Sequence, residues 1–219
     1  MTSLAKCRSR IAERTGRCAQ RTLRRRRGRG VVLVLLCLAG WAGALAAQAP
    51  PPPANGPVIA RAAVAQVGVT LFYDPSYQRL DYPAGDVPRE RGVCADVVIR
   101  ALRTIGVDLQ VAVHEDMRSH FAAYPPLWGL RRPDRNIDHR RVANLMTFLT
   151  RAGKRLGAGA TYEPGDVMAW RLSNGLLHIG VVAEARAPQG HRLAVHNIGS
   201  GAQLEDVLFA FDELGHYRW

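Results

Sequence analysis

The first 57 residues of this chain read as a leader and a spacer, which confines a folded domain to the C-terminal part. A cationic stretch ending in four arginines at 24–27 precedes a mostly apolar run at 31–47. An A-L-A triplet at 44–46 then offers a cleavage site, in the usual order of a secretory signal. Five prolines within 48–57 cannot contribute to a core. We therefore expect a signal peptide over 1–47, a linker over 48–57 and one domain over 58–219.

The same leader carries most of the positive charge of the chain. The formal net charge is +12, yet residues 1–47 hold 11 basic and one acidic residue, while 48–219 hold 19 and 17. Because the domain is nearly balanced, the overall charge does not indicate nucleic acid as a partner. A membrane anchor is the alternative to a cleaved signal, but the apolar run is shorter than the roughly 20 residues of a spanning helix. We expect an exported, periplasmic protein that keeps no stable membrane anchor.

Export would leave a single cysteine. Cys7, Cys18 and Cys37 lie in the predicted signal, and Cys94 lies in the domain. Exported proteins usually pair their cysteines in disulfides. A leftover cysteine is therefore either a buried, inert thiol or a reactive one.

The residues around Cys94 predict that it stands at the start of a helix. Gly92 interrupts the chain, and an apolar face then continues at helical spacing through Val98, Ala101 and Ile105. The free N–H groups of a helix N-terminus carry about half a unit of positive charge, which favours a thiolate and stabilises an oxyanion. The position predicts a nucleophile. The alternative is a small buried hydrophobe on an apolar helix face.

His178 is the best placed of the seven histidines to act as the base. It lies in an otherwise apolar strand, and Gly180 on the same face leaves room for another backbone, such as the start of the Cys94 helix. A third group usually orients such a base. His196 and Asn197 on the next strand point to opposite faces, and the sequence does not fix which of them shares a face with His178. Both remain candidates.

The remaining pattern predicts an α+β fold, because helices come first and a meandering antiparallel sheet follows. A helical insertion is expected at about 111–157. The predicted helices cover 58–67, 94–105, 115–124 and 138–151. The predicted strands cover 167–170, 176–184, 192–198, 207–211 and 216–219.

Three charged or titratable residues outside the pair are candidates for contact with a substrate. Asp96 lies in the first turn of the Cys94 helix, where a carboxylate suits the helix dipole but opposes a thiolate. Asp138 and His139 follow Asn136 in a polar segment whose spacing fits no familiar metal site, and Asp138 could cap the next helix. We therefore expect no metal and no cofactor.

The order of these motifs resembles that of NlpC-type cell-wall cysteine peptidases. The matching motifs are the Cys94 helix start, G-D-V-x-x-W at 165–170, H-I-G-V at 178–181 and V-H at 195–196. Tyr73 resembles the tyrosine that those enzymes carry upstream. More closely, residues 60–219 resemble the exported bacterial family of domain of unknown function 1287. The matching stretches are G-V-C-A-D-V-V-I-R-A (92–101), H-E-D-M (114–117), N-I-D-H-R-R (136–141), H-N-I-G (196–199) and G-H-Y-R (215–218).

The resemblance implies a papain-like core and a monomeric thiol amidohydrolase acting on peptidoglycan peptides or another envelope amide. Its triad would be Cys94, His178 and either His196 or Asn197, with Tyr73 among the substrate contacts. Two alternatives remain. One is a transglutaminase-like acyltransferase, which the G-x-C-x-D pattern resembles, and the other is a non-catalytic envelope module of the same fold.

Overall fold

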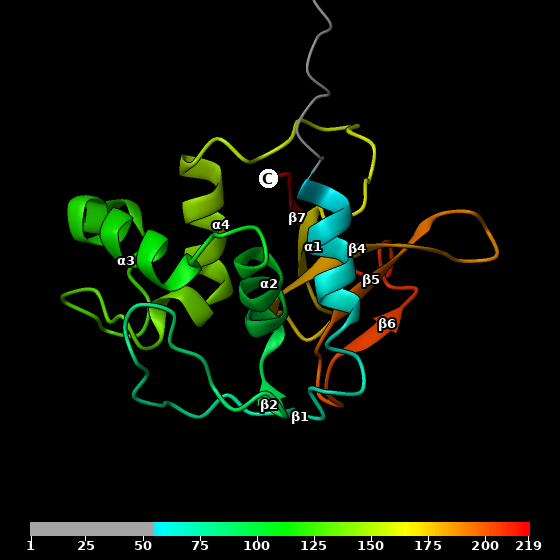
Figure 1. Ribbon diagram of the computed structural model, residues 1–219. Helices are drawn as coiled ribbons and strands as arrows, with labels where there is room; N and C mark the ends of the chain where they lie inside the picture. The colour runs from blue at the N-terminus through cyan, green and yellow to red at the C-terminus, as the bar shows by residue number, and fades with distance from the viewer. Residues whose placement is uncertain (1–54) are drawn as a thin grey trace, which may run out of the picture. The chain divides into compact units, whose positions relative to one another are not determined.

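The computed structural model describes residues 55–219 as a mixed α+β fold with an antiparallel sheet, which confirms the predicted class (Figure 1). No helix in this range is long and apolar enough to cross a bilayer. The helices are α1 (Asn55–Val64), α2 (Cys94–Arg103), α3 (Leu109–His120) and α4 (Val142–Arg151), with 3-10 turns η1 (Phe121–Ala123) and η2 (Asp138–Arg140).

Five strands form the main sheet, in the order β6-β5-β4-β3-β7, with every neighbouring pair antiparallel. They are β3 (Val167–Arg171), β4 (Leu177–Arg186), β5 (Arg192–His196), β6 (Gln203–Glu205) and β7 (Asp212–Tyr217). A separate parallel ladder joins β1 (Phe72–Tyr73) to β2 (Arg91–Gly92), directly before α2.

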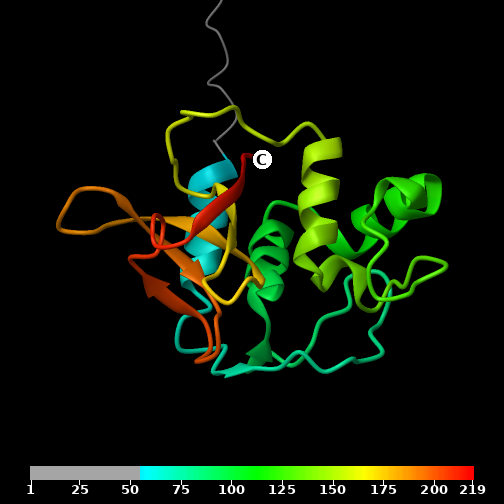
Figure 2. The same cartoon turned by 180° about the vertical axis from the view of Figure 1, so that it is seen from behind.

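The two faces of the sheet have different cores because side chains alternate along each strand. Odd-numbered residues such as Ile179 and Val181 pack with α1, α2 and α4 in the larger cluster. Even-numbered residues such as Met168, Trp170 and Val182 pack on the opposite face with Leu208. The two opposed views show α1 and α2 crossing the face that carries the larger core (Figures 1 and 2).

The helix boundaries differ from the sequence expectations. α1 begins at Asn55, within the predicted linker, while the signal at 1–47 and the first residues of the linker lie outside the described range. α3 begins at Leu109, six residues before the predicted start at 115, because the Asp108 carboxylate accepts the Gln110 N–H and caps it. The predicted helix 138–151 is divided, since the extended backbone of Arg141 separates η2 from α4. Asp138 is therefore not the cap of α4.

The strand predicted at 207–211 is wrong. These residues form a turn between β6 and β7. Leu208 is buried there, and its carbonyl accepts the indole N–H of Trp170 at 3.2 Å. The apolar residues at 207–211 therefore pack over one face of the sheet and do not form a strand.

Candidate active site

Cys94 is the first residue of α2 and is only 4% exposed. It lines a cavity of about 460 Å³. The parallel pairing of Tyr73 with Gly92 brings the tyrosine to the same cavity, and Leu177 at the start of β4 closes another side. Tyr73 and Cys94 are 21 positions apart in the sequence, yet both line this cavity.

Burial dominates the electrostatics of the thiol. It raises the pKa of Cys94 to about 12, and the Asp96 carboxylate adds to the rise. The backbone N–H groups of Ile179, Ala95 and Cys94 itself act in the opposite direction but do not overcome it. Burial likewise raises the pKa of Tyr73. The resting cysteine is therefore a neutral thiol, and the helix N-terminus alone does not ionise it.

The histidine predicted as base has a histidine partner. His178 Nε2 lies 3.0 Å from His196 Nδ1, with the two rings nearly perpendicular. In the hairpin of β4 and β5, Val181 faces Val195, so paired residue numbers add to an even sum. This register puts His196 on the face of His178 and Asn197 on the other. On the far side of His196, Nε2 lies 2.9 Å from the Glu205 carboxylate.

Asn197 has a different place. It is fully buried, and its side-chain amide donates to the Gly92 carbonyl at 3.0 Å, while its own oxygen accepts the Gly199 N–H. These bonds fix the segment that leads into Cys94. Asn197 therefore positions the start of α2 and does not contact His178.

The Cys94 thiol and the His178 ring lie on opposite faces of β4, the strand that carries His178. The thiol packs in the helix-side core with Ile179, whereas the His178 ring stacks against Trp170 on the other side. Between residues 55 and 219, no hydrogen bond joins the Cys94 sulfur to the His178 ring. Burial first, and then His196, lower the pKa of His178 to about 3, so the imidazole is neutral too.

Gly180 does leave room for another backbone, but that backbone is the neighbouring strand β5 and not, as expected from the sequence, the start of the Cys94 helix. A Cβ on Gly180 would lie 2.7 Å from the Val195 carbonyl oxygen and 3.1 Å from both His196 Cβ and the Trp170 ring.

We expect Gly180→Ala to lower the free energy of unfolding by about 1–3 kcal/mol, because the added methyl overpacks this layer. Gly157→Ala is the matched control, since no atom lies within 4 Å of its added Cβ. Urea denaturation of both variants measures the difference. Equal stability of the two variants would show that the residues around Gly180 accommodate the added methyl group without strain.

Asp96 is not available to a substrate. Its carboxylate accepts the Val93 N–H at 2.6 Å and two bonds from the Arg140 guanidinium, both at 2.9 Å. Asp96 and Arg140 are both buried. Arg140 also donates to the carbonyls of Asp74 and Ser76. The ion pair therefore ties the start of α2 to η2 and to the loop after Tyr73. Sequence reasoning missed Arg140, although the segment at 136–141 was the signal for it.

Asp138 and His139 are also buried, which is against their predicted contact with a substrate. Asp138 accepts the Asp134 N–H and an Arg141 N–H, so it holds the turn before α4. Burial first, with a contribution from Arg140, lowers the pKa of His139 to about 4. Neither side chain lines the Cys94 cavity.

His139 predicts a pH-dependent stability. Its folded pKa of about 4 lies below the ordinary value of 6.5, so below pH 6.5 the unfolded state binds more protons and the fold loses stability as the pH falls toward 4. The expected slope is up to about 1.4 kcal/mol per pH unit. Urea titrations between pH 7 and 4.5 should show a shallower slope for His139→Leu than for the parent protein. Identical slopes would contradict this origin.

The G-D motif has a structural role. Asp166 accepts bonds from His216 at 2.7 Å and from the Arg218 guanidinium, which joins the start of β3 to the end of β7. These two partners lower the pKa of Asp166 against the opposing effect of burial. His216 is buried and lies in β7. Across the described part of the chain, no group of three or more Cys, His, Asp or Glu residues is arranged to hold a metal ion.

Comparison with known proteins identifies the family. A protein of Escherichia coli (strain K12), described as "Uncharacterized protein YijF", is 58% identical over 164 residues. The aligned region covers 74% of this chain and 80% of that protein. The sequence profile described as "Domain of unknown function (DUF1287)" matches residues 60–219, which include the Cys94 cavity and the histidine pair. The chain therefore belongs to the family of domain of unknown function 1287.

Proposed function

We propose that this protein is a thiol amidohydrolase of the cell envelope, with Cys94 as nucleophile and His178 as base. One observation carries the proposal. The cysteine at the start of α2 lines an open cavity and packs against β4 at Ile179. The preceding residue of that strand is His178, whose Nε2 is held by His196. A nucleophile beside one strand, a base on that strand and an orienting group on the adjacent strand are the parts that acyl transfer requires.

The proposed reaction conserves atoms and charge. The Cys94 sulfur attacks the amide carbonyl carbon while its proton passes to His178, and the N–H groups at the start of α2 face the developing oxyanion. The amine then leaves with that proton, and water hydrolyses the thioester. Thiol and imidazole are both neutral and lie on opposite faces of β4 in the free protein. The proposed reaction therefore requires β4 to rearrange near residues 178–179 when the substrate binds, because catalytic hydrogen bonds can form only in the substrate complex.

The similarity to NlpC-type, papain-like peptidases supports the choice of substrate. Three of the four motifs of that resemblance lie at β3, β4 and β5, which are neighbours in the sheet. Together with the secretory pattern of the leader, this favours peptidoglycan peptides, in the periplasm, as the amide substrate.

Incubation with purified sacculi tests the proposal. The parent protein should release or shorten muropeptides, and Cys94→Ala should not. His191→Ala is a suitable control, because His191 pairs with Asp206 at the far end of β5 and lines no part of the Cys94 cavity. A muropeptide profile that is the same with the parent protein and with Cys94→Ala would reject hydrolysis of this substrate.

A non-catalytic envelope module is the second candidate, and one observation favours it. The raised pKa of Cys94, near 12, is that of an inert buried thiol. Alkylation by iodoacetamide at pH 6 separates the two. An ordinary, slow rate that His178→Ala leaves unchanged, together with intact sacculi, would assign the module.

A further inference from the structure

A second cavity adjoins the Cys94 cavity. It measures about 600 Å³ and is formed mainly by the loop that follows Gly129, with His114 of α3 on its wall. Tyr77 lines both cavities, and the segment 128–137 contributes residues to both. A ligand that reaches the cysteine can therefore extend past Tyr77 into the second hollow.

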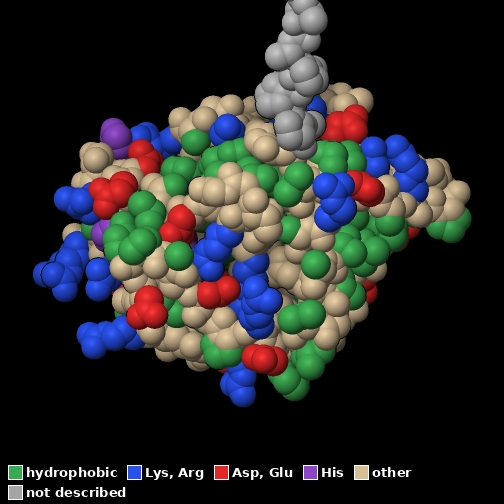
Figure 3. All heavy atoms as spheres, viewed as in Figure 1, with side chains coloured by type: hydrophobic (Ala, Val, Ile, Leu, Met, Phe, Trp, Pro, Cys, Tyr) green, Lys and Arg blue, Asp and Glu red, His purple; other side chains and the backbone are tan. Residues whose placement is uncertain are grey.

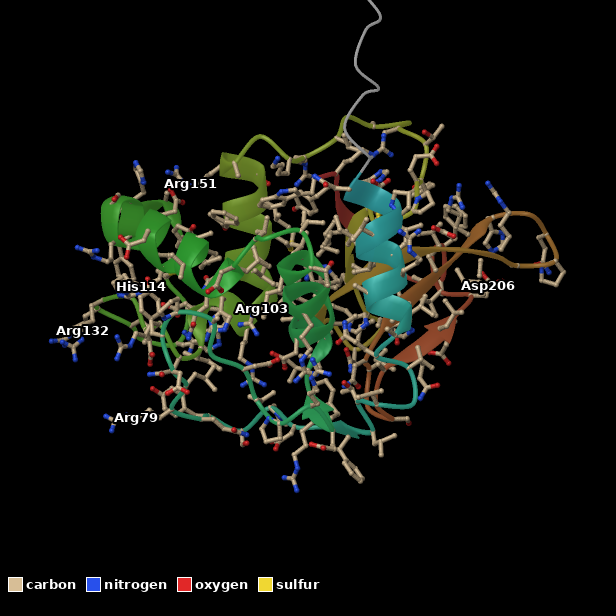
Figure 4. The ribbon with its side chains drawn as sticks, viewed as in Figure 1. Arg79, Arg103, His114, Arg132, Arg151 and Asp206 are labelled. Atoms are coloured by element: carbon tan, nitrogen blue, oxygen red, sulfur yellow. The ribbon has the colours of Figure 1, made fainter. Side chains whose placement is uncertain are left out.

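Arginine dominates the charge of this second wall. Arg131, Arg132 and Arg135 line it, and Arg79 lies nearby at the same edge of the molecule. Figure 3 shows Lys and Arg side chains gathered at this edge, and Figure 4 shows Arg79 and Arg132 extending outward below α3. Asp134 is the one carboxylate among the residues that line this wall, and it already accepts the Tyr77 hydroxyl and the Asn136 N–H.

These four arginines differ from most of the other arginines between residues 55 and 219. None of them has an ion-pair partner within residues 55–219, whereas ten arginines in the same range do. Arg135 packs over the Tyr82 ring, which leaves its N–H groups free for another partner. Unpaired guanidinium groups around a hollow suit a planar, bidentate anion such as a carboxylate.

We propose that the cavity lined by Arg131, Arg132 and Arg135 binds a carboxylate group on the peptide whose amide bond reaches Cys94. The inference rests on the proposed function and specifies its substrate as an acidic peptide. Because Tyr77 and the segment 128–137 contribute to both cavities, the carboxylate belongs on a residue close to the one attacked. The concave shape favours such a compact anion over a flat anionic bilayer.

Binding to the Cys94→Ala protein tests the arginine cavity without turnover. The probes are fluorescein-labelled Ala-Glu and its neutral match Ala-Gln amide, followed by fluorescence anisotropy. We expect the acidic probe to bind at least 10-fold more tightly in low salt, and the preference to shrink at 0.5 M NaCl. Arg131→Gln/Arg132→Gln/Arg135→Gln should abolish the preference. Arg61→Gln/Arg89→Gln/Arg186→Gln removes the same charge elsewhere on the surface and should retain it.

Labelling of Cys94 in the parent protein tests the link between the two cavities. Iodoacetyl-Ala-Glu should alkylate the cysteine at least 10-fold faster than iodoacetyl-Ala-Gln amide, and the triple substitution at 131, 132 and 135 should equalise the rates. Mass spectrometry of the tryptic peptide gives the rate. Binding preference without a labelling preference would overturn the link, because the anion site would then serve something other than the Cys94 substrate.

The remaining outcomes separate the two proposals. No acidic preference in either assay overturns this inference even if sacculi are hydrolysed. An arginine-dependent preference in both assays supports it even if sacculi stay intact, in which case the failure lies with the proposed reaction. Arginine-dependent binding to phosphatidylglycerol vesicles, with no preference for the acidic peptide, would assign the surface to a membrane and reject the peptide.

Discussion

His178→Gln should lower the rate of muropeptide release by about 10²–10⁴-fold, the usual contribution of a positioned general base. Glutamine keeps a similar size in the layer beside Trp170 and can still bond to His196, but it cannot accept the thiol proton. The corresponding rise in the activation barrier is about 2.7–5.5 kcal/mol. Initial rates on sacculi, with reduced muropeptides separated by chromatography, measure the loss.

Substitutions at His196 distinguish a base from the residue that orients it. His196→Ala should lower turnover less than His178→Gln does, because the base remains but its ring is no longer held at Nε2. His196→Asn, which can restore a bond to that nitrogen, should recover part of the rate, and the pH profile should shift in the alanine variant. A rate that is insensitive to His178→Gln while Cys94→Ala is inactive would assign the base to another group.

The sequence predicted the parts of this site that depend on local patterns. Cys94 begins α2 as expected. Gly92 and the helical spacing of the apolar residues that follow it are local signals, contained within about a dozen residues of sequence. The pairing of His178 with His196 followed once the hairpin register was known, and only the parity of that register was missing from the sequence.

The parts that depend on tertiary packing could not be predicted. Asp96 looks like an available carboxylate in the sequence, yet it is buried because Arg140, 44 residues later, folds back onto it. The face on which His178 lies relative to Cys94 depends on which side of the sheet α2 covers, and strand alternation alone leaves that open. The pKa values likewise depend on burial, which dominates at both Cys94 and His178.

Arg140→Met should lower the free energy of unfolding by about 3–5 kcal/mol, the usual effect of removing one partner of a buried ion pair. The substitution leaves the Asp96 carboxylate in the core with the Val93 N–H as its one remaining hydrogen-bond partner within residues 55–219. The carbonyls of Asp74 and Ser76 lose a donor as well. Urea denaturation at pH 7, compared with the conservative Arg140→Lys, measures the loss.

The double variant Asp96→Asn/Arg140→Met separates the uncompensated charge from the lost packing. The asparagine oxygen can still accept the Val93 N–H and cap α2, while no net charge remains buried. We expect the double variant to recover at least half of the stability that Arg140→Met loses. If both variants are equally unstable, the cost lies in the loop contacts of Arg140 rather than in the stranded carboxylate. In that case the ion pair would serve mainly to hold residues 74–76, and hence Tyr73, against the start of the Cys94 helix.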